Sequence, residues 1–261
     1  VAAFEKGWTP ATLIMDVPIE FPDGYKPTNY DEKFRGPVLL REALGSSYNI
    51  PAVKTLQYVG LPAFLETAQR LGIHSLNRPD DYGLSLALGA GDVTLLELTS
   101  AYAVFANGGR RVPPVAVLRI LDNDGQVIEQ YHPAEGQQVI SPQHAYLITD
   151  ILSDNEARTP AFGPNSVLKL SRPAAVKTGI SDGWRDNWTI GYTPDLVAGA
   201  WVGNSDNTPM ALISAVAGAG PIWHNFMEEA LAGTPPREFI RAGGIETIEI
   251  CADSGTIPSQ V

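Results

Sequence analysis

Lys177, Thr178 and Gly179 form a triplet whose residue types suit the binding of an anionic, peptide-like ligand. The lysine supplies positive charge, the threonine supplies a hydroxyl, and the glycine leaves one face of a strand open to another backbone. Apolar residues precede the triplet at 173–176 and recur at 188–192, which favours a buried sheet. The structural alternative is a lysine on an edge strand with its amine in solvent, and a bare triplet is weak evidence on its own.

One known type of serine acyl-transfer site requires this triplet together with three other features. These are a nucleophilic serine followed one helical turn later by a lysine, a Ser-x-Asn triplet on a facing loop, and backbone N–H groups that bind an oxyanion. In such a site Lys177 provides charge, Thr178 binds the terminal carboxylate of the substrate, and Gly179 lets a peptide lie along the strand.

The Ser-x-Asn triplets of the sequence include those that begin at Ser47, Ser153 and Ser205. We assign the first, because it interrupts two helical patterns, whereas the second ends a helical pattern and the third follows a strand as a turn. Ser46 is adjacent, but the spacing to Asn49 selects Ser47. The Ser47 hydroxyl is suited to relay a proton and the Asn49 amide to hold a peptide group. A loop serine and a helix-capping asparagine are the alternative reading.

Ser166 and Lys169 form the only Ser-x-x-Lys spacing in the sequence, and we reject them as the nucleophile and its base. They follow the assigned Ser-x-Asn triplet instead of preceding it. Their segment, FGPNSVLKLSRP, is too rich in glycine and proline for a helix, and without a helix the two side chains do not share a face.

Helical patterns dominate the first part of the chain. They end at glycines or begin at capping residues, and we place them at 38–47, 50–60, 61–72, 94–108, 141–152 and, near the C-terminus, 221–231. The residues VAAFEKG at the start resemble the end of a helix that closes at Gly7. The segment 16–37 is expected to be loop.

Strand patterns follow, and the order of elements predicts an α+β fold. A hairpin is expected at 115–132 around the Asp122–Gly125 turn, and an antiparallel meander at 173–180, 187–192 and 196–203. We place one domain at 1–232 and a C-terminal tail, expected to be β-rich with a strand at 246–250, at 233–261.

Composition excludes several functions. The net charge of −11 and the lack of a lysine or arginine block argue against nucleic acid as a partner. The single cysteine, Cys251, allows neither an internal disulfide nor a cysteine metal site, and the four histidines show no metal-binding spacing, so we expect no metal and no cofactor. No apolar run approaches the ~20 residues of a membrane span, and no signal peptide is visible.

Four blocks together resemble the transpeptidase domain of class A penicillin-binding proteins. They are GPVLLREALGSSYNIPAV, YGLSLALGAGDVTLLELTSAYAVFANGG, ILSDNEARTPAFGPNSVLKLSRPAAVKTG and RDNWTIGYTPDLVAGAWVGN. The resemblance runs from about residue 1 to about residue 230. It implies a β-lactamase-like transpeptidase fold, with a helical subdomain and an antiparallel sheet flanked by helices. It also implies a D-alanyl-D-alanine transpeptidase that cross-links peptidoglycan stem peptides and is inhibited by β-lactams.

The resemblance further implies an extracytoplasmic, membrane-anchored protein with a glycosyltransferase domain upstream. The family's nucleophile begins the helix whose end resembles VAAFEKG, so we expect the catalytic Ser-x-x-Lys to precede Val1 and the chain itself to be inactive. The residue types then make Ser47 and Lys177 catalytic, and Asn49, Thr178, Gly179, Ile180 and Ser181 substrate-binding.

The sequence departs from the family where a second hydroxyl residue usually follows Lys-Thr-Gly. Ile180 stands there and Ser181 comes next. A backbone N–H of Ile180 still serves an oxyanion hole, but side-chain contact to the substrate carboxylate is reduced. In the loop that follows, Trp184 is a candidate to line the cleft and Arg185 a candidate to pair with Asp186 or with a substrate carboxylate, although structural roles are favoured for both.

Two other functions remain open from the sequence. One is a non-catalytic scaffold that binds peptides. The other is a serine β-lactamase, which shares the fold and adds a base that activates water for deacylation. A glycosidase would need two paired carboxylates, and the acidic residues here are scattered.

Overall fold

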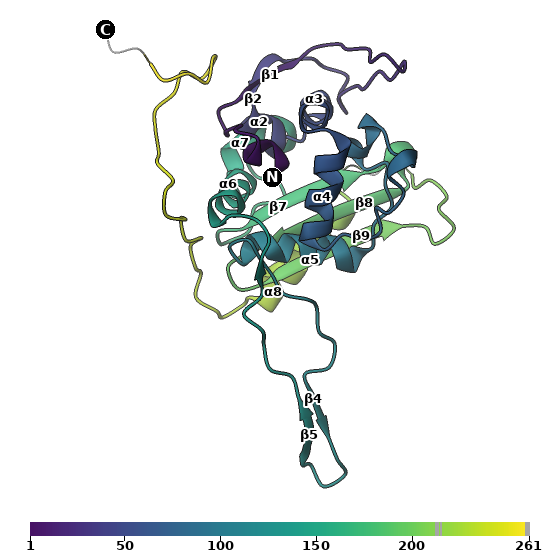
Figure 1. Ribbon diagram of the computed structural model, residues 1–261, viewed down its shortest axis with the longest axis vertical. Helices are drawn as coiled ribbons and strands as arrows, with labels where there is room; N and C mark the ends of the chain where they lie inside the picture. Colours follow the sequence, from purple (N-terminus) through teal and green to yellow (C-terminus); the bar gives the residue numbers. More distant parts are fainter. Residues whose placement is uncertain (212–213, 215, 259–261) are drawn as a thin grey trace.

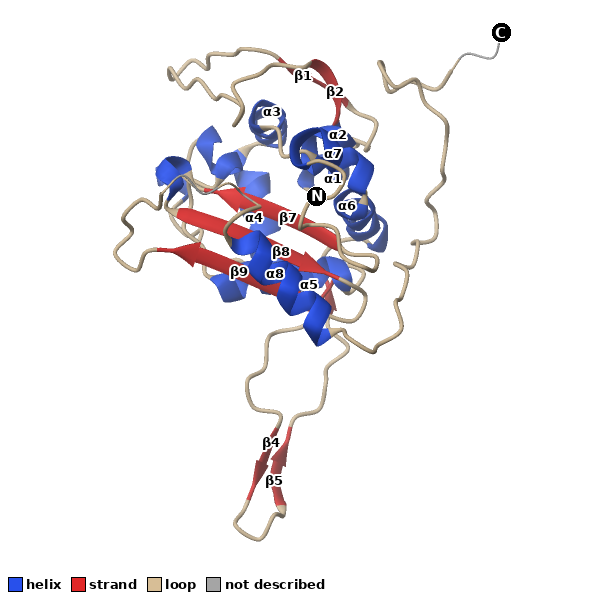
Figure 2. Cartoon of the chain, turned by 180° about the vertical axis from the view of Figure 1, so that it is seen from behind, coloured by secondary structure: helices blue, strands red, loops and turns tan. Residues whose placement is uncertain are grey.

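The computed structural model describes residues 1–211, 214 and 216–258 and has the expected α+β architecture. A three-stranded antiparallel sheet lies at the centre, with helices against both faces (Figures 1 and 2). Further helices gather beside the sheet, and a hairpin and an extended tail lie outside this body.

The central sheet is the predicted meander. Its strands pair in chain order and are β7 (Ala175–Ile180), β8 (Asp186–Tyr192) and β9 (Val197–Gly203). The turn between β8 and β9 is closed by the hydroxyl of Thr193, which accepts hydrogen bonds from the N–H groups of Asp195 and Leu196. This short turn places the two strands directly beside each other.

Helices α5 (Leu95–Ala106) and α8 (Ala219–Ala230) cover opposite faces of the sheet (Figures 1 and 2). Gly191 in β8 is required by α8, because a Cβ at that position would lie 2.4 Å from the ring of Trp223. Burial of the Trp223 ring against the strand is therefore possible only with glycine there.

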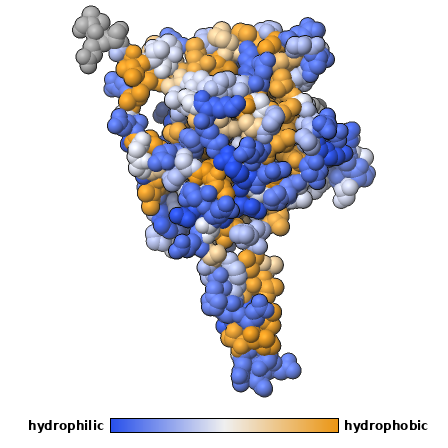
Figure 3. Space-filling view, viewed as in Figure 1, coloured by the Kyte–Doolittle hydropathy of each residue, from blue (hydrophilic) through white to orange (hydrophobic). Residues whose placement is uncertain are grey.

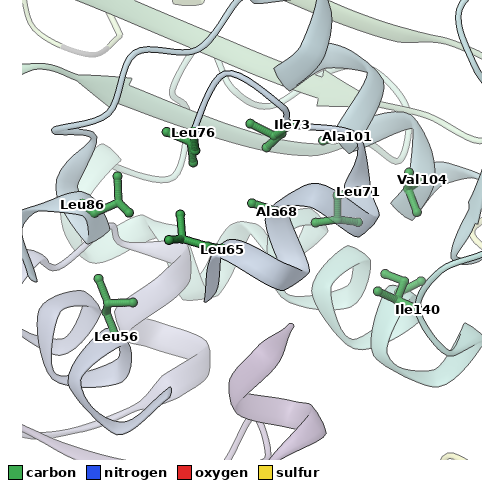
Figure 4. Packing of buried hydrophobic residues seen from close by; sticks show 11 residues of the cluster. Leu56, Leu65, Ala68, Leu71, Ile73, Leu76, Leu86, Ala101, Val104 and Ile140 are labelled. Carbon is green, nitrogen blue, oxygen red and sulfur yellow. The ribbon is translucent and has the colours of Figure 1, made fainter. Parts of the chain in front are cut away.

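The helical patterns near the N-terminus are confirmed. They correspond to α2 (Leu40–Gly45), α3 (Asn49–Val59) and α4 (Leu61–Leu71), with short 3₁₀ turns η1 (Pro79–Asp81) and η2 (Leu84–Leu88) before α5. Leu56, Leu65 and Val104 belong to a core cluster that joins α3, α4 and α5 (Figure 4). α1 (Ala2–Glu5) is followed by its C-cap Lys6 and then by the predicted Gly7, which has a φ of +93°.

Helix α6 (Pro142–Ser153) packs against β7 and helix α7 (Asn155–Phe162) packs against α2, and the sequence predicted only the first of these two helices. α6 is capped by Ser141 as expected, since the Ser141 hydroxyl accepts a hydrogen bond from the His144 N–H at 3.1 Å. α7 was not predicted. Its pattern is obscured because Pro160 lies inside it, and Asp154 caps it only one residue after α6 ends.

The segment 16–37 was expected to be loop, but strands include its two ends. β1 (Leu13–Asp16) and β2 (Gly36–Leu39) pair antiparallel across it, and Asp16 lies opposite Gly36. Four-residue strands carry too little alternation to be recognised, and their pairing is decided by the helices beneath them.

The predicted hairpin is present as β4 (Arg119–Leu121) and β5 (Val127–Gln130). It projects from the body on a stalk that begins at the paired strands β3 (Arg110–Arg111) and β6 (Gln137–Gln138) (Figure 1). Apolar residues are exposed along it, as Figure 3 shows.

The tail runs along the side of the molecule (Figure 1). The strand predicted at 246–250 is wrong, because the described part of the tail, residues 233–258, contains no strand and is not β-rich. The backbone there has no neighbouring strand to pair with, so local β-propensity alone does not produce one.

Candidate active site

Ser47 lies in a tight backbone turn between α2 and α3. Its φ is +60°, a left-handed conformation that is uncommon for a residue with a Cβ. The neighbouring hydroxyl of Ser46 is buried and donates to the carbonyl oxygen of Ala157 at 2.8 Å, and the Tyr48 N–H donates to the carbonyl oxygen of Ala43 at 2.9 Å. These bonds anchor the turn on both sides of Ser47 and commit Ser46 to structure.

The Lys177 amine meets the Ser47 hydroxyl. Lys177 Nζ donates to Ser47 Oγ at 2.6 Å and to the carbonyl oxygen of Thr178 at 2.8 Å, although Ser47 and Lys177 are 130 residues apart. Burial lowers the pKa of Lys177 to about 8. The amine therefore changes charge near neutral pH, which is where a group that moves protons is most effective.

A cavity of about 620 Å³ contains this contact. All seven candidate site residues line it: Ser47, Asn49, Lys177, Thr178, Gly179, Ile180 and Ser181. They come from only two places, the turn before α3 and the strand β7 with its end. The sequence prediction that these two segments face a shared groove is confirmed.

Gly179 leaves the β7 side of the cavity open. A Cβ at this position would meet only the Trp188 side chain, at 3.8 Å, and Trp188 lies opposite it on β8. The open strand fits the predicted approach of a peptide backbone.

Ser181 lines the cavity, but its hydroxyl is engaged elsewhere. Ser181 Oγ donates to Asp186 Oδ2 at 2.8 Å and accepts from the Asp186 N–H at 2.9 Å. The Trp201 indole N–H donates to the other oxygen of the same carboxylate. The Ser181 proton is therefore directed at Asp186 and not into the cavity.

In the loop after Ser181, the structure does not have the predicted ion pair between Arg185 and Asp186. Arg185 donates to the carbonyl oxygen of Asn207 and makes no ion pair with Asp186, whose carboxylate binds Ser181 and Trp201. Trp184 lies near the Tyr30 ring from the β1–β2 loop, with 6.2 Å between centroids. Asp186 and Trp188 also line the cavity, and the sequence analysis did not assign them. The strand pairing with β7 is the signal that would have placed them there.

The rejected triplets and the rejected Ser-x-x-Lys lie outside the cavity lining. Ser153 is the last residue of α6, and Ser205 is in a turn after β9. Ser166 and Lys169 lie in a turn, where the Lys169 N–H donates to the carbonyl oxygen of Ser166. The absence of a helix at these two residues confirms the reason for rejecting them.

Metal and membrane features were searched over the described residues. No group of three or more His, Cys, Asp or Glu side chains there is arranged to hold a metal ion. None of the described helices combines the length and the apolar character needed to span a bilayer.

Comparison with known proteins agrees with this geometry. Residues 1–228 match the family model described as the penicillin binding protein transpeptidase domain. The chain is 32% identical to penicillin-binding protein 2D of Bacillus subtilis, over 97% of this chain and 37% of that protein. It is also 32% identical to penicillin-binding protein 1A of Neisseria lactamica, over 94% of this chain and 32% of that protein. The chain thus spans about a third of the length of these relatives.

Solved structures show the same fold. The crystal structure of penicillin-binding protein 1A from Haemophilus influenzae superposes with a TM-score of 0.87 at 28% identity, over 99% of this chain and 44% of that one. PonA1 from Mycobacterium tuberculosis in complex with penicillin V superposes with a TM-score of 0.77 at 26% identity, over 92% of this chain and 68% of that one. Because the family model matches residues 1–228 and these relatives are 32% identical over more than nine tenths of this chain, the chain belongs to the penicillin-binding protein transpeptidase family.

Proposed function

We propose that this chain is the part of a peptidoglycan cross-linking enzyme that binds stem peptides and assists acyl transfer from D-alanyl-D-alanine. The observation that carries the proposal is the 2.6 Å contact between Lys177 Nζ and Ser47 Oγ inside the cavity. This lysine is partly buried, and no carboxylate is among its partners in the hydrogen bonds and ion pairs of the described residues. Burying an amine in this way is costly unless it serves a ligand or a reaction.

The site residues take distinct roles in this proposal. The Lys177 ammonium and the Thr178 hydroxyl bind the terminal carboxylate of the donor peptide, which lies along Gly179. Ser47 Oγ accepts a hydrogen bond from Lys177 Nζ, so its own proton is available for transfer to the leaving amine. The Asn49 amide holds the peptide group of the donor. The Ile180 N–H stabilises the oxyanion.

The reaction needs a nucleophile, and we propose that it is a Ser-x-x-Lys serine that precedes Val1 in the encoded protein. Val1 lines the same cavity as Ser47 and Lys177, which supports a nucleophile close to it in sequence. The serine oxygen bonds to the carbonyl carbon, and the C–N bond to the terminal D-alanine breaks. The proton of that serine passes to the lysine of its motif and, by way of Ser47, to the departing amine. An acceptor amine then attacks the acyl carbon, the bond from this carbon to the serine oxygen breaks, and the proton lost by the acceptor amine returns to the serine, which closes the cross-link.

Without that serine the chain should form no acyl-enzyme, since loss of the nucleophile costs several powers of ten in rate. We also propose that the complete protein is membrane-anchored and extracytoplasmic and carries a glycosyltransferase domain upstream. The relatives named above are penicillin-binding proteins of about three times the length matched, which supports additional domains. Residues 1–232 would form the transpeptidase unit, and residues 233–261 a separate tail.

Incubation with benzylpenicillin followed by intact-mass spectrometry tests the proposal. The complete protein should gain the mass of one drug molecule, and peptide mapping should locate it on a serine upstream of Val1. The chain 1–261 should gain none. An adduct on Ser47 or Ser166 would show that the nucleophile is misassigned.

The same incubation distinguishes the two other functions. A complete protein that forms no adduct is a scaffold and not a transpeptidase. A complete protein that rapidly releases hydrolysed penicillin is a β-lactamase, since a transpeptidase keeps the acyl group for much longer.

A further inference from the structure

The first turn of α3 is capped by a residue from a different part of the chain. Tyr48 occupies the N-cap position and makes no side-chain cap. Instead, Asn29 Oδ1 in the loop between β1 and β2 accepts the N–H groups of Asn49 at 2.9 Å and Ile50 at 3.3 Å. Asn29 is 3% exposed, so water does not compete for these two groups.

Asp16 determines which way the Asn29 amide faces. Asn29 Nδ2 donates to both oxygens of the fully buried Asp16 carboxylate, at 2.8 and 2.9 Å, and to the carbonyl oxygen of Lys33 at 2.7 Å. The Arg35 N–H also donates to Asp16. Since Asn29 Nδ2 faces only acceptors and Asn29 Oδ1 faces only donors, the reversed amide would break every hydrogen bond that the Asn29 side chain makes.

The same loop holds the side chain of Asn49. Asn49 Nδ2 donates to the carbonyl oxygen of Thr28 at 2.9 Å, next to the residue that binds its backbone. The position of Asn49 in the cavity therefore depends on residues 28 and 29 for both backbone and side chain. Ser47, two residues earlier, shares the same short turn.

We propose that Asn29, oriented by Asp16, is a positioning residue that presents Asn49 to the acyl group of the donor. The inference rests on the proposed function, because it assumes that Asn49 holds the donor's peptide group. Asn29 does not line the cavity and acts only through Asn49. Its loss should weaken contacts to that peptide group and spare the residues of β7.

Two β-lactams separate this role from general destabilisation. Benzylpenicillin carries a side-chain amide that resembles the donor peptide group, whereas 6-aminopenicillanic acid carries a free amine there. In the complete protein, Asn29→Ala should slow acylation by benzylpenicillin about tenfold, as for loss of one hydrogen bond of ordinary strength. Acylation by 6-aminopenicillanic acid should change less than about threefold. An equal loss for both would overturn the inference.

Thr94→Ala is the matched control, because it removes the cap of α5, where the Thr94 hydroxyl accepts the Glu97 N–H at 3.1 Å. It should lower stability by a similar amount and leave the ratio of the two acylation rates unchanged. If Thr94→Ala changes this ratio as much as Asn29→Ala does, loss of any helix cap is enough to alter the ratio, and Asn29 has no specific role.

Exchanging the two residues tests the orientation by Asp16. Asn29→Asp alone places two carboxylates face to face and should be the most damaging variant. In Asp16→Asn/Asn29→Asp, the amide at 16 donates to the carboxylate at 29, which accepts the α3 N–H groups directly. It should recover benzylpenicillin acylation at least severalfold over Asn29→Asp, and no recovery would refute the role of Asp16.

Hydrogen exchange gives a result that does not require acylation. The first N–H groups of a helix are ordinarily unprotected, so protection of Asn49 and Ile50 in the complete protein should be lost in Asn29→Ala while β7–β9 stay protected. Unchanged exchange there would contradict the cap. A wild-type protein that forms no adduct would refute the transpeptidase proposal, and exchange would still decide whether Asn29 holds Asn49.

Discussion

At the scale of single residues, the charge of Lys177 is the most sensitive feature of the site. Its amine has two oxygen acceptors, Ser47 Oγ and the carbonyl oxygen of Thr178, and neither carries a full negative charge. Burial therefore dominates and lowers the pKa of Lys177 to about 8, from 10.5 for a free lysine. An anionic ligand would supply the missing counter-charge and favour the ammonium form.

We predict that binding of anionic donors weakens as the pH rises through about 8. The ammonium is present below this pKa and is lost above it, so at pH 9 about one molecule in ten keeps the charge. The second-order rate constant for benzylpenicillin acylation of the complete protein should fall about tenfold between pH 7 and pH 9. Lys177→Arg, which stays charged, should be slower but nearly flat over this range. A flat wild-type profile would contradict the role of Lys177 as a carboxylate ligand.

At the scale of elements, α7 supports the turn that carries Ser47. Asp154 caps α7 through the N–H groups of Glu156 and Ala157, and the Ala157 carbonyl oxygen accepts the Ser46 hydroxyl. α7 lies directly against α2, because a Cβ on Gly45 would come within 3.0 Å of the Ala157 backbone. The turn is therefore held by a helix more than a hundred residues away in sequence.

We predict that Gly45→Ala destabilises the protein and slows acylation. Alanine improves helix propensity by about 1 kcal/mol, but the added methyl meets backbone atoms that cannot rotate away, which costs about 1–3 kcal/mol. The steric cost should exceed the gain in helix propensity, so that α2 is displaced and the position of Ser47 shifts. Urea unfolding and acylation rates provide the measurement.

Gly83→Ala is the control for this prediction, since a Cβ there has no neighbour within 4 Å and φ is −121°. It should leave both stability and acylation close to wild type. A Gly45→Ala protein that behaves like Gly83→Ala would show that α2 and α7 can separate without disturbing the site.

At the scale of the whole molecule, the body and the hairpin are nearly independent. The residues of β4 and β5 are all exposed, including Ile120 at 41% and Ile128 at 67%. The strands β3 and β6 pair at the base, so the chain already closes on itself before the hairpin begins. Figure 1 shows the hairpin extending away from the sheet.

We predict that replacing residues 113–135 by a short glycine-serine linker leaves the fold and the site intact. Exposed residues contribute little burial, and a shorter loop costs slightly less entropy to close. The melting temperature should change by less than about 3 °C, which corresponds to no more than about 1 kcal/mol for a domain of this size. The rate of acylation of the complete protein by benzylpenicillin should also be unchanged. A drop of the melting temperature by about 8 °C or more would mean that the hairpin supports the body.

Local patterns accounted for much of the fold. Amphipathic runs with glycine ends predicted α3 and α4, the Ser141-Pro142 start predicted α6, and alternating strands predicted the meander. The patterns did not predict β1, β2 or α7, because each is short and depends on partners distant in sequence. The strand expected in the tail was wrong for the converse reason: a β-like segment without a pairing strand does not form one.

The sequence by itself determined the chemical groups of the site and the order in which they occur, because residue types and turn signals are local properties. Only the tertiary structure decided that Lys177 Nζ lies 2.6 Å from Ser47 Oγ, that burial lowers its pKa, and that Ser181 is engaged by Asp186. The tertiary structure alone also decided that Asn29 caps α3. These contacts depend on how helices and strands pack across the cavity, and packing is set by the whole chain.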